Sequence, residues 1–220
     1  MRISLQKVIA VLAAGALMVI AYYADYLPLK KSDAFITALR NMGNVKSLDE
    51  FKQNFSYPLD IPSPIGQEEL VRNLGGSIVN IINANGENNP ALVGELLKYL
   101  DSYYQPIMQT GRGMSFAQNV FILGNAYQAA YIRTKNPQYL ARAIEYYRQG
   151  NQEVSSKRPQ FLYGLFDVYR MAGDTPDAIN IAQRILQLWP DDQSVQRALD
   201  QLMAPQAVPT STNRKAPNSK

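Results

Sequence analysis

The sequence predicts an all-α chain in which a single N-terminal transmembrane helix precedes antiparallel helical hairpins. Three observations favour this fold class: a 17-residue uncharged run lies near the N-terminus, apolar residues recur at helical spacing through most of residues 31–203, and strand-like alternation is scarce. The pattern divides the chain into four parts: 1–29, 30–115, 116–203 and 204–220.

The first part, residues 1–29, is expected to be a signal-anchor segment. Its apolar run spans residues 8–24 and, at about 1.5 Å per residue, covers roughly 25 Å of the ~30 Å hydrocarbon core. Arg2 and Lys7 precede the run, so the positive-inside rule places the N-terminus in the cytoplasm and the helical domain outside the cell membrane. A cleaved signal peptide ending at Ala21 is the alternative. Tyrosines typical of a membrane interface follow the run: Tyr22, Tyr23 and Tyr26.

The second part, residues 30–115, should contain helices that are separated by prolines and glycines. Ser47 and Glu50 form a capping box for a helix that should end near Phe55, because Pro58 and the prolines after it exclude a continuous helix.

Two longer amphipathic helices should follow within the same part. Pro64 opens one that ends at Asn85. Asn89 caps the next, and Pro106 together with the Gly111-Arg112-Gly113 segment should break the chain after it.

The third part has the most regular pattern, and it predicts two helical hairpins and a terminal helix. Only short connections separate the predicted helices, and short connections join helices that pack as antiparallel neighbours. An internal repeat is visible where ILGNAY, at 122–127, aligns with GLFDVY, at 164–169. The expected helices span 116–133, 137–152, 159–172, 176–189 and 193–203.

The spacing of Tyr169, Ala178 and Pro190 resembles a tetratricopeptide repeat, a 34-residue helical hairpin that stacks into an α-solenoid. The pattern departs from that family at Phe166 and Ala182. The resemblance implies a short solenoid, and an unrelated helical bundle is the alternative. It also implies that the matching residues pack the hairpins together: Leu123, Gly124, Tyr127, Ala143, Leu165, Tyr169, Ala178 and Pro190.

A wider resemblance covers nearly the whole chain. The chain has an apolar segment, a short linker, a helix reading KSDAFITALR, a stretch reading SLDEFKQNFSYPL and then the repeat hairpins. This order is similar to the C-terminal end of bacterial O-antigen ligase family proteins. Those proteins are polytopic membrane enzymes that handle lipid-linked glycans, and in many of them the last transmembrane helix leads into an extracytoplasmic repeat domain. This chain lacks the membrane part that transfers glycans, so no catalytic residue is carried over.

Composition excludes several kinds of chemistry. Because the chain has no Cys and no His, it has no disulfide, no thiolate or imidazole metal site and no His-activated nucleophile. Three carboxylate pairs lie at or near predicted helix starts, where anions stabilise free N–H groups: Asp49-Glu50, Glu68-Glu69 and Asp191-Asp192. We therefore expect a protein that is not an enzyme and that has no cofactor and no metal.

The formal charge of +4 lies at the two ends of the chain. Residues 26–204 contain equal numbers of acidic and basic side chains, so nucleic acid is not an expected partner. The tail, residues 204–220, has the composition of a disordered segment and carries three of the basic residues: Arg214, Lys215 and Lys220.

A binding surface is expected on the first helix of each hairpin, because these helices line the concave side of a solenoid. This surface suits an extended peptide or a glycan. We expect a membrane-anchored binding or scaffold module whose partner is a protein or peptide, such as a membrane protein of envelope or surface-glycan assembly. The alternative is a detached C-terminal part of an O-antigen ligase or polymerase that is not catalytic by itself. The candidate binding residues are Gln118, Phe121, Asn125, Gln128, Tyr163, Asp167 and Arg170.

Overall fold

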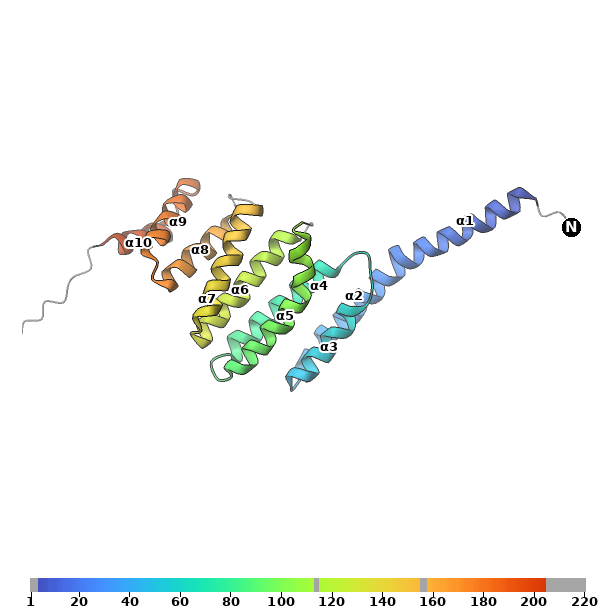
Figure 1. Ribbon diagram of the computed structural model, residues 1–220, viewed down its shortest axis with the longest axis horizontal. Coiled ribbons are helices and arrows are strands. Elements are labelled where there is room, and N and C mark those ends of the chain that lie inside the picture. Colours follow the sequence, from blue (N-terminus) through green and yellow to red (C-terminus); the bar gives the residue numbers. More distant parts are fainter. Residues whose placement is uncertain (1–3, 113–114, 155–157, 205–220) are drawn as a thin grey trace, which may run out of the picture.

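The computed structural model describes residues 4–112, 115–154 and 158–204, and all regular structure in these residues is helical (Figure 1). The predicted all-α class is therefore confirmed for this part of the chain. The predicted disordered tail, except Ala204, lies outside the described residues. The elements are α1 (Leu5–Ala21), η1 (Tyr22–Tyr26), α2 (Leu27–Asn41), η2 (Met42–Asn44), α3 (Leu48–Asp60), α4 (Gln67–Asn85), α5 (Pro90–Thr110), α6 (Phe116–Thr134), α7 (Pro137–Gln149), η3 (Gly150–Val154), α8 (Pro159–Ala172), α9 (Thr175–Leu188) and α10 (Gln193–Met203).

The N-terminal elements form one continuous helix from Leu5 to Asn44 that is long and apolar enough to span a membrane. None of the residues of α1 is buried. The expected boundary at residue 29 falls inside this helix, so no linker separates the apolar segment from the helical region. The π turn η1 lies just before Pro28, which lacks an N–H group and whose ring would clash with a carbonyl of a regular α-helix.

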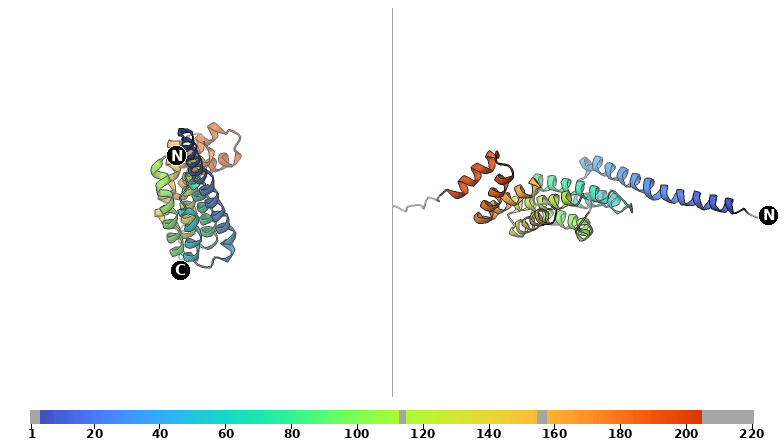
Figure 2. Two further views of the ribbon diagram at one scale, coloured as in Figure 1. Left: turned by 90° about the vertical axis from the view of Figure 1, so that its right-hand side faces the viewer. Right: turned by 90° about the horizontal axis from the view of Figure 1, so that it is seen from above.

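The remaining helices pack in a row (Figures 1 and 2). Helix α2 packs on α3, α4 packs on both α5 and α6, and each helix from α6 to α10 packs on the next. Helix α1 projects from one end of the row, and α10 lies at the other end. The described ends of the chain are therefore far apart.

Three proline-based predictions of helix ends are wrong. Pro58 lies inside the last turn of α3, and Pro106 lies inside α5, which ends instead at the other predicted break, before Gly111. Each proline removes one backbone hydrogen bond, and burial of neighbouring side chains such as Leu59 and Ile107 outweighs the loss. Pro64 does not open α4, because the chain first turns through Gly66, whose φ of 91° suits glycine.

In the regular part, three helices meet at one buried aromatic ring. The ring of Tyr147, from α7, lies between Gly124 of α6 and Gly164 of α8. A Cβ atom on Gly124 would lie 2.7 Å from Tyr147 Cε1, and one on Gly164 would lie 2.9 Å from the same atom. These glycines therefore allow three helices to approach one buried ring.

The first helix of the row is joined to α3 by a buried ammonium. Lys31 is 3% exposed, and its Nζ donates hydrogen bonds to the carbonyl oxygens of Leu59 (3.1 Å) and Ile61 (2.7 Å) at the C-terminal end of α3. Burial lowers the pKa of Lys31, and nearby Asp60 opposes that shift. A cation at this position also stabilises the negative end of the α3 dipole.

The substitution Gly124→Ala should destabilise the fold, because Tyr147 cannot move away from the new methyl group without meeting Gly164. Overpacking of this kind costs about 1–3 kcal/mol of unfolding free energy. Thermal unfolding of the full chain in detergent, followed by circular dichroism, measures the effect. The control is Gly76→Ala in α4, where a Cβ meets nothing within 4 Å, so that the helix gains about 0.5–1 kcal/mol. Equal shifts for the two variants would contradict the packing described here.

The substitution Lys31→Met should also destabilise the fold, because it leaves the carbonyl groups of Leu59 and Ile61 without their donor. Loss of a buried donor costs about 1–3 kcal/mol. The matched control is Lys30→Met, since Lys30 is exposed on the same helix, and its effect should stay within about 0.5 kcal/mol. Unfolding curves that coincide for the two variants would show that the ammonium does not stabilise the fold.

Candidate functional site

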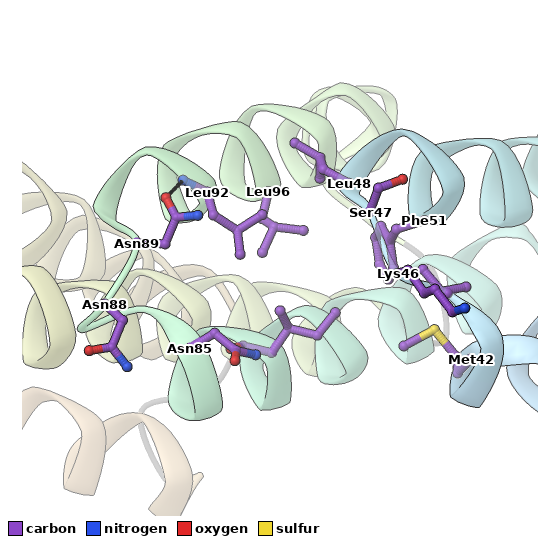
Figure 3. A pocket seen from close by; sticks show the side chains of 12 residues that line it. Met42, Lys46, Ser47, Leu48, Phe51, Asn85, Asn88, Asn89, Leu92 and Leu96 are labelled. Carbon is purple, nitrogen blue, oxygen red and sulfur yellow. Dashed lines mark hydrogen bonds between the residues drawn. The ribbon is translucent and has the colours of Figure 1, made fainter.

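A groove of about 590 Å³ lies between the α2–α3 junction and the α4–α5 turn (Figure 3). Leu92 and Leu96 project into it from α5, and Phe51 and Met42 border its other end. Phe51 and Leu96 are buried, whereas the other apolar lining residues are partly exposed. The groove therefore has an apolar floor that is open to solvent.

Polar groups border this floor at the helix ends. Asn89 caps α5 by accepting a hydrogen bond from the backbone N–H of Leu92 (3.0 Å), and Ser47 caps α3 in the same way. Within the described part of the chain, the side-chain amide of Asn88 and the side-chain ammonium of Lys46 have no hydrogen-bond or ion-pair partner. Donors and acceptors for a bound molecule are thus available at the rim.

The chemistry of the lining suits binding. The residues that line the groove include three asparagines, one lysine and one serine as polar groups, and no carboxylate. Amides can both donate and accept hydrogen bonds, as a peptide backbone does, and the apolar floor adds contact area.

A second depression, also of about 590 Å³, lies between α5 and α7. Asp101 lines it, and its Oδ2 accepts a hydrogen bond from the hydroxyl of Tyr127 at 2.6 Å. Burial raises the pKa of Asp101, while Tyr127 and Arg142 oppose the shift. The other carboxylate oxygen and the hydroxyl of Tyr104 are buried without a partner among the described residues.

The candidate residues on α6 contact neighbouring helices to different degrees. Gln118 accepts a hydrogen bond from Arg72 of α4, and Gln128 accepts one from the hydroxyl of Tyr147 (2.6 Å). Phe121 packs against the rings of Tyr147 and Phe161. Asn125 is half-buried and makes no side-chain hydrogen bond within the described residues. Most of this predicted set therefore bridges helices.

The candidates on α8 are more open. Asp167 and Arg170 are exposed, and the Arg170 guanidinium lies over the ring of Phe166 at 5.3 Å. Tyr163 instead donates to Asp192, the residue that caps α10, and its ring packs against Trp189. The structure thus leaves Asn125, Asp167 and Arg170 as the open polar groups of the predicted surface.

The residues that carry the tetratricopeptide resemblance are buried, apart from Pro190, which is exposed. The departures from the pattern, Phe166 and Ala182, are buried as well. These buried residues fill the space between helices rather than face solvent. They are Leu123, Gly124, Tyr127, Ala143, Leu165, Tyr169 and Ala178.

The carboxylate pairs have structural contacts at helix starts. Glu68 and Glu69, in the first turn of α4, accept hydrogen bonds from the backbone N–H and the hydroxyl of Ser115, at the start of α6. Asp192 caps α10, and Glu50 accepts from the backbone N–H of Lys46. Within the described part of the chain, no group of three acidic residues could hold a metal ion.

The groove and the environment of Asp101 were not predicted from the sequence. The groove unites two segments that are about forty residues apart, at Ser47 and Asn89, and only their capping signals were visible. Asp101 lies within an amphipathic helix, where an acidic side chain is ordinary.

Comparisons with known proteins give no match: no family profile, no curated protein and no solved structure is similar to this chain.

Stability should fall steeply above pH 10 and should change little between pH 6 and 9. Burial raises the pKa of Tyr146 to about 12, and desolvation together with Asp192 raises that of Tyr163 to about 12. Burial also raises the pKa values of Tyr104, Tyr127 and Tyr147. A raised folded-state pKa favours folding below the unfolded value of about 10, and this contribution is lost as the pH rises through the folded values.

Circular dichroism and tyrosinate absorbance, measured together from pH 6 to 13, test this expectation. Because the chain has no His, no imidazole titrates in the neutral range. Buried tyrosines should ionise only as helicity is lost, and a return to pH 7 should restore both signals. Ionisation of all tyrosines near pH 10 with intact helicity would contradict the burial described above.

Proposed function

We propose that this protein is a membrane-anchored binding module whose helical row faces the extracytoplasmic side. The observation that carries the proposal is the continuous helix from Leu5 to Asn44, whose exposed apolar half leads directly into a packed row of helices. The basic residues Arg2 and Lys7 precede the apolar half, which supports a cytoplasmic N-terminus.

The groove at the α2–α3 junction supports binding of a protein or peptide. Its apolar floor and its amide rim match an extended segment with alternating apolar side chains and backbone polar groups. The open polar residues of α8 supply a second patch, farther along the row. In this proposal the row is a short tetratricopeptide-like solenoid, a view supported by the close packing of α4 on α6 and by the buried repeat residues.

The resemblance to the end of O-antigen ligase family proteins supports a scaffold role in envelope or surface-glycan assembly. It also supports a second candidate: a split-off C-terminal part of such an enzyme, inactive without its membrane half. The order of the segments supports this second candidate, whereas the continuous helix from Leu5 to Asn44 stands where that resemblance expects a short linker. A neighbouring gene that encodes many hydrophobic segments would favour it over an independent scaffold.

Topology is tested by a reporter fused after Met203. Alkaline phosphatase, which is active only outside the cytoplasm, should be active, whereas green fluorescent protein at the same position should be dark. Alkaline carbonate should leave the chain in the membrane pellet, because α1 is inserted rather than adsorbed. The reverse reporter pattern would overturn the outward orientation, and release by carbonate would overturn the anchor.

Binding at the groove is tested by a photoreactive side chain in native membranes. Benzoylphenylalanine in place of Asn88 should give a product of defined mass, and Leu92→Arg in the same chain should abolish it, because a charge occupies the apolar floor. Gln196 on α10 is exposed and remote, so benzoylphenylalanine at that position is the matched control. Identical products from both positions would refute a specific site in the groove.

A further inference from the structure

The N-terminal helix carries an exposed stripe, most of which turns away from α3. Its member Asp33 lies at the edge and also lines the depression between α2 and α3. Helix α2 buries Leu27, Lys31, Phe35 and Ala38. At about 100° per residue, the α2 residues on the opposite side form one row, and the stacked rings of the π turn η1 continue it toward α1. Its members are Tyr22, Tyr26, Leu29, Asp33 and Ile36.

This stripe is apolar and unpartnered. Its large apolar side chains are exposed to solvent: Tyr22 is 48% exposed, Tyr26 53%, Leu29 70% and Ile36 42%. The rings of Tyr22 and Tyr26 stack with centroids 5.5 Å apart, which shows that these residues share a face across the π turn. From Val8 to Ala21, α1 is apolar on every face, so the stripe is followed by apolar surface in α1.

The spacing of the stripe is that of a two-helix interface. Steps of three, four and three residues separate Tyr26, Leu29, Asp33 and Ile36, which is the alternation of the a and d positions of a heptad. Tyr22 joins this row across the π turn, where its ring stacks on that of Tyr26. A row with this spacing stays against a partner helix along the whole length of the contact. It therefore fits a second helix that runs nearly parallel to the first.

The charges beside the stripe are complementary to those of an identical helix. Asp25 and Lys30 fall on opposite flanks of the row, five residues apart, as do the g and e positions that meet across a parallel pair. Neither side chain has an ion-pair partner within the described part of its own chain. Two symmetric Asp25–Lys30 pairs would form between two copies.

We propose that the stripe binds a second copy of this chain in a parallel pair. The proposal rests on the membrane anchor proposed above, because copies with the same topology present the stripe at the same height and in the same direction. Such a contact is isologous, so one surface serves both partners. Pairing would place two grooves on one membrane-bound unit.

Asp33 limits the strength of this pair. It occupies a seam position between Leu29 and Ile36, so two copies bring two carboxylates together, and like charges at a contact oppose association. Replacement by leucine would complete the apolar seam. The substitution Asp33→Leu is therefore expected to increase pairing. This direction is diagnostic, because a substitution that merely perturbs the helix would decrease pairing.

The test uses the absence of cysteine from the chain. Leu29→Cys and Ile36→Cys, each in the full chain in native membranes, are treated with a short bismaleimide. Both positions are exposed, so the fold tolerates the change. Each should give a product of twice 24.6 kDa, and Ser32→Cys on the flank should give less. Ser102→Cys, exposed on α5, is the remote control and should give none.

Charge reversal tests the register of the pair in the Leu29→Cys background. Lys30→Glu should lower the yield about three-fold, as expected for loss of two exposed ion pairs. The double change Asp25→Lys with Lys30→Glu should restore it, and Asp33→Leu should raise it. The same samples are fractionated: chain in the soluble fraction overturns the anchored function. If the chain is in the membrane but the crosslinking yields at Leu29→Cys and Ser102→Cys are equal, only the proposed pairing is overturned. Crosslinked products of a different mass would overturn it as well.

Discussion

The buried ammonium of Lys31 is the contact on which the arrangement of this molecule depends. It joins α2, which continues the apolar helix, to the carbonyl groups at the end of α3, from which the chain turns toward α4. Because Asp60, next to those carbonyls, also accepts a hydrogen bond from Tyr103 of α5, the contact extends into the row. The direction of the apolar helix is therefore coupled to the direction of the whole row.

This coupling relates the proposed functions to one another. In the proposed topology, a rigid passage from α1 to α2 would fix the height of the groove above the membrane; the groove lies next to the α2–α3 junction. It also leaves the outer face of α2 free, since α3 covers only the inner face. Farther along the row, glycines that admit one tyrosine ring hold three helices together, so that the groove and the open residues of α8 belong to one packed body.

Sequence periodicity predicted most of the fold because helical spacing and caps are local signals. The helices between residues 116 and 203 begin and end close to the predicted residues, and the caps Ser47 and Asn89 are confirmed. Helix ends were predicted wrongly at Pro58 and Pro106, because both prolines lie near the ends of helices in which packing outweighs the lost hydrogen bond. The groove was missed because it forms between segments that only the tertiary packing brings together. The polar surface on α6 was predicted by register alone, which could not show that Gln118 and Gln128 bond to other helices.

Rigid continuity between the membrane helix and the row is the central claim, and a distance measurement tests it most directly. Spin labels at Leu17→Cys in α1 and Ser102→Cys in α5 report the distance within one chain when labelled copies are diluted with unlabelled ones in a bilayer. Double electron–electron resonance should give one narrow distance distribution, which Lys31→Met should broaden. A broad distribution in the unmodified background would contradict the claim, because it would show that α1 moves independently of the row.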